Sequence, residues 1–186
     1  MEKLKTKKNF FYFVSLILFT FLVISNSPAF FPRLLPDSYD YITFQNATTR
    51  NLLYTTIYLS LKKLNIEIFH VQVFILSFSI CFLVITLNLI KINKYLVFFF
   101  WIFVSLNTYY TSFSKTILPE VIFFSLINFS IGLLILNIRY KNFFLFFMFC
   151  LVLGFLAITK KIGIVLSIMF IIFYTLKYGT KKKKFF

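Results

Sequence analysis

The sequence has few charged residues, and very few of them are acidic. Only 5 Asp and Glu occur in 186 residues, against 20 Lys and Arg, and charged residues make up 13% of the chain. A soluble globular domain usually carries about 25% charged residues. A chain with so few charged residues has too little polar surface to cover a water-soluble globular domain. This composition therefore excludes an ordinary soluble domain.

Residues that commonly bind metals are also scarce. The chain has two cysteines, Cys81 and Cys150, and a single histidine, His70. Both cysteines lie inside apolar runs, without CxxC spacing or neighbouring ligand types. We expect them to act as small apolar side chains, and we expect His70 to pack near an interface.

Apolar residues dominate what is present. They make up 60% of the chain, 30 residues are Phe, and the mean hydropathy is +0.90. These values predict an all-α, multi-pass integral membrane protein with the lipid bilayer as part of its solvent. The basic residues lie at the chain ends and in short breaks between apolar runs, which is typical of charges that set membrane orientation. We therefore expect no nucleic acid partner.

Apolar runs of helical length predict a single transmembrane domain over residues 1–186, with about six spans. The expected spans are 10–26, 67–90, 95–110, 121–138, 143–159 and 162–176. No small-residue cleavage site follows the first run, so we expect it to be a retained signal anchor. Several runs are shorter than the ~20 residues a spanning helix needs, but flanking polar side chains can extend them by snorkelling.

Six spans place both termini in the cytoplasm. Of the 20 Lys and Arg, 13 then lie inside and 7 outside, which is the expected bias. The Lys, Ile, Asn and Phe bias is typical of an AT-rich bacterial genome, so we expect a bacterial inner membrane. The first outer loop, 27–66, holds three of the four prolines, and we expect short helices in it, including an interfacial helix over 51–64.

Nearly all acidic residues fall on the outer side in this topology. Apart from Glu2, they are Asp37, Asp40, Glu67 and Glu120. A carboxylate near a bilayer is costly and tends to mark function. A structural alternative is that Asp37 caps a helix that starts at Pro36-Asp37. Glu67 is better explained as a helix start beside the positive end of the dipole.

Four short motifs resemble, in order, those of the GT-C superfamily of membrane glycosyltransferases, in the style of the protein-mannosyltransferase and aminoarabinose-transferase group. "PDSYDY" is similar to the D-S-x-x-Y signature of the first outer loop, and "RNLLYTTIYLSLKKL" to the R-x-P-L-Y-P segment, without its prolines. "SKTILPEVIFFSLI" resembles the second outer loop, and "GFLAITKKIGIVLSIMF" the G-x-x-x-x-T-R-P stretch between spans five and six. The matching residues are Asp37, Ser38, Tyr41, Arg50, Tyr54, Glu120, Gly154 and Thr159. Lys160 stands where Arg is usual, and Lys161 replaces proline.

The resemblance covers about residues 10–176 and implies transfer of a sugar from a polyprenyl-phosphate carrier to an acceptor at the outer face. Such enzymes commonly have more spans and a further domain, so we expect this chain to correspond to the N-terminal part only, as a truncated form. The alternative is a non-catalytic polytopic membrane protein, such as a transporter or flippase subunit. Transporters usually carry ionisable residues or broken helices at mid-membrane, whereas these spans contain almost no charge.

The expected catalytic residues are Asp37, Asp40 and Glu120, with Asp37 as the general base. Asp40 or Glu120 could bind a divalent metal through oxygen ligands, or hydrogen-bond the acceptor. Cations on the same face would stabilise the leaving phosphate. The expected substrate-binding residues are Tyr41, Arg50, Tyr54, Lys115, Lys160 and Lys161. For Lys160 and Lys161, anchoring of helix ends at the interface is the alternative.

Overall fold

The computed structural model describes residues 2–27, 34, 36–43 and 52–182. Every regular element within these ranges is helical, so the predicted all-α class is confirmed. The elements are α1 (Glu2–Asn26), α2 (Pro36–Thr43), α3 (Leu52–Lys63), α4 (Ile68–Leu89), α5 (Lys94–Leu106), α6 (Thr108–Ser112), the 3₁₀ turn η1 (Phe113–Lys115), α7 (Glu120–Tyr140), α8 (Phe143–Thr159) and α9 (Lys161–Lys182).

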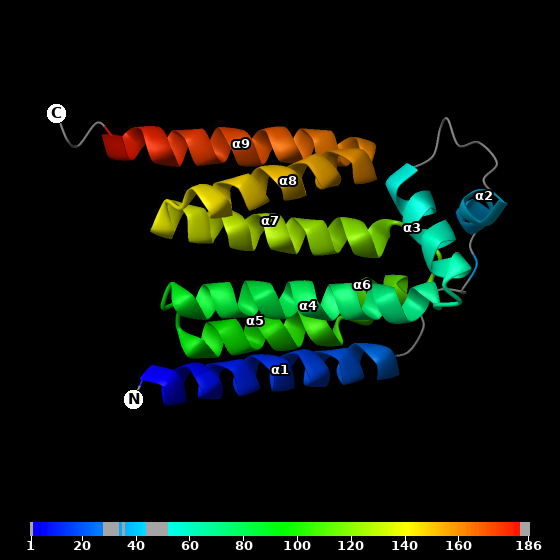
Figure 1. The fold of residues 1–186 in the computed structure, drawn as a ribbon, viewed down its shortest axis with the longest axis horizontal. Helices are drawn as coiled ribbons and strands as arrows, with labels where there is room; N and C mark the ends of the chain where they lie inside the picture. Colours follow the sequence, from blue (N-terminus) through cyan, green and yellow to red (C-terminus); the bar gives the residue numbers. More distant parts are fainter. Residues whose placement is uncertain (1, 28–33, 35, 44–51, 183–186) are drawn as a thin grey trace.

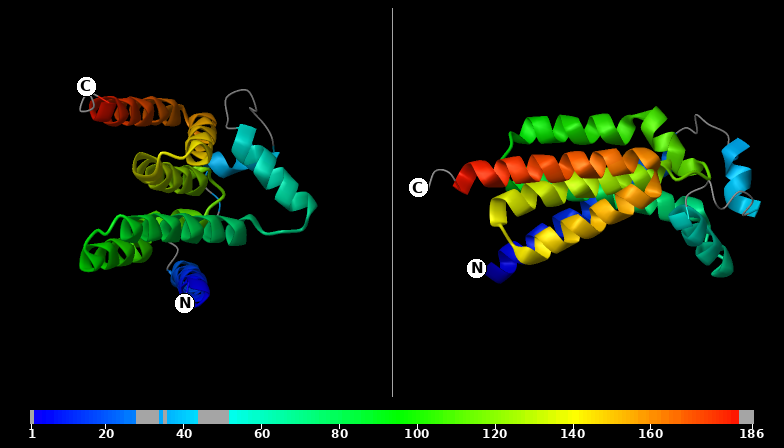
Figure 2. Two further views of the ribbon diagram at one scale, coloured as in Figure 1. Left: turned by 60° about the vertical axis from the view of Figure 1, so that its left-hand side comes forward. Right: turned by 90° about the horizontal axis from the view of Figure 1, so that it is seen from above.

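Six long helices run side by side and alternate in direction along the chain (Figures 1 and 2). The start of α1 and the end of α9 lie at one end of the bundle, together with the α4–α5 and α7–α8 connections; we call this the terminal end. Helices α2, α3 and α6 lie at the other end, which we call the α2–α3 end (Figure 1). The two ends therefore carry different connections.

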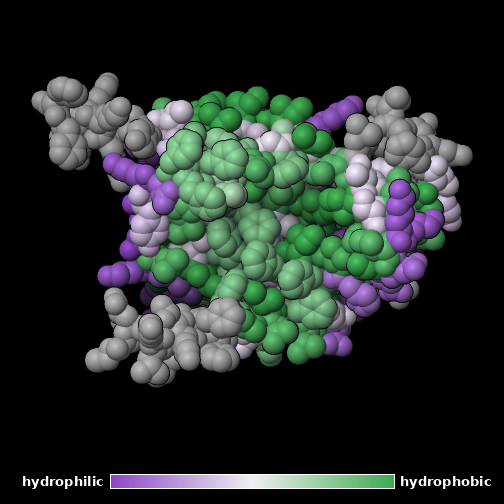
Figure 3. Space-filling model, in the orientation of Figure 1, coloured by the Kyte–Doolittle hydropathy of each residue, from purple (hydrophilic) through white to green (hydrophobic). Residues whose placement is uncertain are grey.

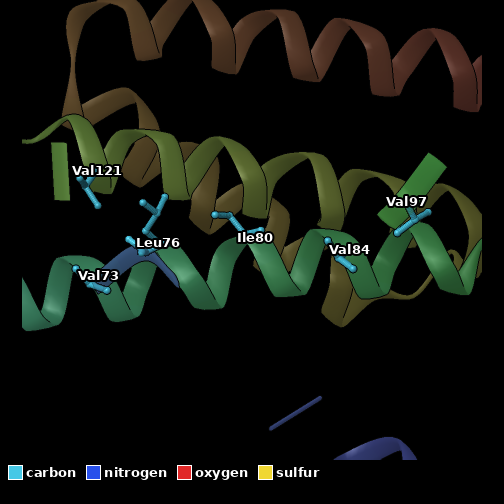
Figure 4. Packing of buried hydrophobic residues seen from close by; sticks show 7 residues of the cluster. Val73, Leu76, Ile80, Val84, Val97 and Val121 are labelled. Carbon is cyan, nitrogen blue, oxygen red and sulfur yellow. The ribbon is translucent and has the colours of Figure 1, made fainter. Parts of the chain in front are cut away.

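Helices α4 and α7 form the centre of the bundle. Helices α1 and α5 pack against α4, and α8 and α9 pack against α7. One core cluster joins Leu76 and Ile80 of α4 to Val121 of α7 and Val97 of α5 (Figure 4). Gly132 of α7 lies against the Phe82 ring of α4, where an added Cβ would come within 2.5 Å of that ring. Absence of a side chain at Gly132 allows this close approach.

Asparagine side chains begin three of the helices. Asn93 Oδ1 accepts a hydrogen bond from the Tyr95 amide at 2.9 Å, and Asn142 Oδ1 accepts one from the Phe144 amide at 2.8 Å. Asn107 caps α6 in the same way. Such side chains satisfy backbone amides that have no partner inside the helix. The breaks predicted after residues 90 and 138 thus become short turns with defined caps.

The apolar ranges predicted from the sequence are helical, with shifted bounds. Helix α8 has the bounds expected for its run, whereas α9 continues to Lys182 and α1 begins at Glu2. Helix α5 is shorter than expected and ends at Leu106 rather than near residue 110, because Asn107 has an extended conformation. The expected short helices in the 27–66 connection are present as α2 and α3.

The polar stretch after α5 is buried, whereas the sequence predicts a polar break in the second outer loop. Thr111, Ser112, Ser114 and Thr116 are each 0% exposed. The Ser114 hydroxyl donates to the Thr111 carbonyl at 2.6 Å, and the Thr116 hydroxyl to the Phe113 carbonyl at 2.9 Å. These local bonds satisfy hydroxyls that would otherwise be costly to bury. The segment therefore packs into the bundle end.

Two helices in the described part, Ile68–Leu89 and Glu120–Tyr140, are long and apolar enough to cross a membrane by length and composition. Shorter apolar helices are Tyr12–Asn26, Lys94–Leu106 and Phe143–Thr159. Apolar residues form a broad band across the face in Figure 3, with hydrophilic residues gathered at both ends. The predicted crossing of the membrane by all six long helices stays a prediction.

Candidate functional site

A cluster of polar and aromatic residues lies at the α2–α3 end, where α2, α3 and α4 meet. We call Tyr41 of α2, Tyr54 of α3 and Gln72 of α4 the Tyr54 cluster. The rings of Tyr41 and Tyr54 pack edge to face, with centroids 5.0 Å apart. The Gln72 amide nitrogen donates to the Tyr54 hydroxyl at 3.1 Å and to the Leu118 carbonyl at 3.0 Å. Tyr54 and Gln72 are completely buried.

An ion pair joins α7 to the turn between α8 and α9. The Lys160 ammonium lies 2.5 Å from Glu120 Oε1 and 5.8 Å from the centroid of the Phe123 ring. Glu120 is the first residue of α7, where the helix dipole favours a negative charge. Lys160 follows the last residue of α8, where a positive charge is favoured for the same reason. The side chains are 32% and 20% exposed for Lys160 and Glu120, so water screens the pair only in part.

Two oxygen atoms in this region are buried and have no hydrogen-bond partner among the described residues: Gln72 Oε1 and Glu120 Oε2. Both are acceptors, so each requires a donor such as a hydroxyl or an ammonium group. Buried acceptors without partners are uncommon in folded proteins and cost free energy. The α2–α3 end therefore carries acceptor capacity that its own described side chains do not use.

Tyr54 is held as a neutral hydroxyl. Burial is the main cause that raises its pKa above the usual range, and the negative charge of Glu120 adds to the rise. The hydrogen bond from Gln72 acts in the opposite direction but is the smaller effect. Tyr54 can thus donate or accept a hydrogen bond, but it is no base at physiological pH.

Lys115 lies away from the Glu120–Lys160 pair. Its ammonium donates to the Ser25 carbonyl at 2.9 Å and also to the Ser27 carbonyl, both at the end of α1. Burial lowers the pKa of Lys115. A lysine that bonds the last carbonyls of a helix has a structural explanation. The structure thus gives Lys115 a helix-capping contact, and its predicted substrate contact stays a prediction.

The other predicted residues are placed only in part. Asp37 and Asp40 belong to α2, with Asp37 one turn before Tyr41, but their side chains lie outside the described residues. Arg50 lies wholly outside them. Lys161 is the first residue of α9 and is exposed. It directly follows Lys160 of the ion pair in the sequence.

In the described part of the chain, no group of three or more His, Cys, Asp or Glu side chains comes together to hold a divalent metal. The Glu120 carboxylate is already paired with Lys160. Glu67, the other described glutamate at this end, lies 3.6 Å from His70 on an exposed helix start. Glu120 and Glu67 therefore supply no metal site between them, and metal binding by Asp40 stays a prediction because its side chain lies outside the described residues.

Sequence reasoning missed Gln72 and Phe123, which lie next to the predicted residues. The one signal for Gln72 was an amide inside an otherwise apolar run, since a buried amide requires partners. Phe123 carries no comparable signal among 30 phenylalanines.

Comparison of this chain with protein-family models, curated proteins and solved structures finds no match.

Proposed function

We propose that this chain is a multi-pass membrane glycosyltransferase that uses a polyprenyl-phosphate sugar donor at the α2–α3 end. The observation that carries the proposal is the Glu120–Lys160 pair, which holds a cation and a partly unsatisfied carboxylate beside the buried Tyr54 cluster. The resemblance to GT-C enzymes supplies the reaction class, and the clustering of Tyr41, Tyr54, Glu120 and Lys160 supports it.

The alternating helices support a membrane-embedded bundle with six crossings. Lys91, Lys94, Arg139 and Lys141 lie at the terminal end, whereas Glu67 and Glu120 lie at the α2–α3 end. In the proposed orientation the terminal end faces the cytoplasm, following the positive-inside rule. The sugar-transfer site then faces the outside of a bacterial inner membrane.

The polar groups at the α2–α3 end suit a sugar linked to a phosphate. Lys160 and the exposed Lys161 can contact the phosphate oxygens, as ammonium groups commonly do. A phosphate that draws Lys160 away from Glu120 would free both carboxylate oxygens to accept hydrogen bonds from sugar or acceptor hydroxyls. Binding of a phosphate would thus replace the Glu120–Lys160 ion pair by a contact between Lys160 and the ligand.

The proposed reaction assigns the general base to Asp37, on the same helix as Tyr41. A hydroxyl or amine of the acceptor attacks the anomeric carbon and gives its proton to the Asp37 carboxylate. The bond between the anomeric carbon and the phosphate oxygen breaks, and polyprenyl phosphate leaves with its electron pair. Lys160 and Lys161 stabilise the negative charge that grows on this phosphate. Asp40 has a supporting role near the acceptor.

The test measures release of labelled sugar from a panel of polyprenyl-phosphate sugars by membranes containing the full chain. Asp37→Asn keeps the size of the side chain in the first turn of α2 but removes its charge. Loss of a general base should lower transfer by about 10²-fold or more while the amount of protein in the membrane stays unchanged. Asp40→Asn should have a smaller effect.

Glu67→Gln is the matched control, because it removes an exposed carboxylate from the same end. It should leave transfer unchanged. Normal transfer by Asp37→Asn would leave Asp37 with only a structural role in the first turn of α2. Membranes with normal protein levels and no transfer from any donor would favour a non-catalytic membrane protein instead.

A further inference from the structure

A groove of about 1120 Å³ lies at the terminal end, far from the Glu120–Lys160 pair. Its walls come from α1, α4 and α5 and from the α4–α5 turn. This size is comparable to that of pockets that enclose small ligands. The groove plays no part in the proposed sugar transfer.

Cationic and amide groups form one side of this groove. Lys91, Lys94, Asn88 and Asn93 line it, and among the residues with described side chains no acidic one lines the groove. Lys91 has a φ of 63°, a left-handed conformation that ends the turn after α4. Both lysines are exposed. The charge of this rim is therefore complementary to an anion.

Apolar and aromatic side chains form the rest of the groove. Leu16 of α1 and Val97, Phe98 and Trp101 of α5 line it. The Trp101 indole N–H donates to the Thr20 hydroxyl at 3.0 Å, which fixes the ring between α5 and α1. Trp101 is seven residues beyond Lys94, which corresponds to about 10 Å along a helix. The lining of the groove thus changes from cationic to apolar side chains over a distance comparable to the part of a lipid acyl chain nearest the headgroup.

We propose that this groove binds an anionic glycerophospholipid, with its phosphate at Lys91 and Lys94 and an acyl chain against Phe98 and Trp101. A cationic rim above an apolar wall matches an anionic amphiphile, and basic pockets between helices on the cytoplasmic side bind anionic headgroups. A soluble phosphate would satisfy the lysines but leave the apolar wall without a partner. The proposal rests on the membrane orientation proposed above and is independent of sugar transfer.

Trp101 is the only tryptophan in the chain, so its fluorescence reports on this groove directly. The full chain is reconstituted in two bilayers of the same phosphatidylcholine and phosphatidylglycerol content. In one bilayer the phosphatidylglycerol carries bromine near the top of an acyl chain; in the other, an equal amount of phosphatidylcholine does. We expect stronger quenching by brominated phosphatidylglycerol, with a preference in association constant of up to about thirtyfold for two lysines near an anionic headgroup.

The variant Lys91→Asn/Lys94→Gln removes both charges, and Asn tolerates the left-handed backbone at position 91. The Trp101 fluorescence of this variant should be quenched equally by the two brominated lipids. Lys141→Gln/Lys177→Gln removes two lysines that do not line the groove, Lys141 at the terminal end and Lys177 near the end of α9, and should keep the preference. Lys94→Arg keeps the charge and should also keep the preference for phosphatidylglycerol. If circular dichroism shows that the double variant loses helicity, the single variant Lys94→Gln replaces it in the test.

Equal quenching of the wild-type protein by the two lipids would overturn the proposal. So would a preference that survives Lys91→Asn/Lys94→Gln, or one that Lys141→Gln/Lys177→Gln abolishes to the same degree, since general surface charge would then explain it. Competition by soluble glycerol phosphate as effective as that by unlabelled phosphatidylglycerol would show that the acyl chain contributes nothing. None of these results depends on whether the protein transfers sugar.

Discussion

At the scale of single residues, Lys115 shows how a cation can stabilise the bundle through backbone carbonyls. Its ammonium reaches the carbonyls of Ser25 and Ser27, which have no partner within α1. The contact ties the segment after α5 to the end of α1, 88 to 90 residues earlier. Lys115 therefore fixes where the buried segment 107–119 meets the first helix.

Replacing Lys115 by Met should destabilise the protein. Methionine keeps the length of the side chain but removes the donor from two partly buried carbonyls, at a cost of about 1–3 kcal/mol in total. The measurement is unfolding of the purified protein in a mixed-micelle titration. Lys62→Met, at an exposed position in α3, is the control and should change the midpoint little.

The sequence predicted some of these residue contacts but not others. Glu120 and Lys160 were expected on the same side because the six-span topology places both in outer loops, but their ion pair was not predicted. The part played by Gln72 could not be predicted, because its partners, Tyr54 and the Leu118 carbonyl, are 18 and 46 residues away in the chain. Contacts of this kind depend on how α3, α4 and the segment before α7 meet.

At the scale of elements, the α8–α9 turn is the tightest connection between two long helices. Only Lys160 lies between them, with an extended backbone. Gly163 lies so close to the backbone of α8 that an added Cβ would collide with the Leu156 carbonyl. The position of Lys160 relative to Glu120 thus depends on a glycine three residues later.

Gly163→Ala should therefore be destabilising by about 1–3 kcal/mol, as overpacking against a rigid neighbour usually is. Gly154→Ala is a matched control in α8, since nothing lies within 4 Å of its added Cβ. Alanine is the better helix former by roughly 0.5–1 kcal/mol, so this control should be neutral or slightly stabilising. Thermal unfolding in detergent compares the two; equal loss of stability would contradict the predicted collision.

Helix types were easier to predict than helix ends. Long apolar runs and basic breaks indicated the helices, since both are local features of the chain. The early end of α5 depended on Asn107, whose side chain caps the following α6. A polar residue near the end of an apolar run can either continue the helix or begin a new one, and tertiary packing of 108–119 decides between them.

At the scale of the whole molecule, the separation of the two bundle ends predicts opposite exposure across a membrane. In a variant without Cys81 and Cys150, single cysteines would replace Lys63 in α3 and Ile92 in the α4–α5 turn; both positions are exposed. An impermeant thiol reagent added to intact cells should label position 63 but not 92. After the membrane is permeabilised, both should react. Equal labelling in intact cells would contradict the six-crossing arrangement.

The single-residue link between α8 and α9 has a consequence for biosynthesis. In the six-crossing arrangement proposed above, two helices joined so closely have no free loop between them, so we expect α8 and α9 to enter the bilayer together as a helical hairpin. The charges of Lys160 and Lys161 then cross the apolar layer together, at the tip of that hairpin. Glu120 precedes them in the chain and will already have crossed, so its carboxylate is in place to receive Lys160 on arrival.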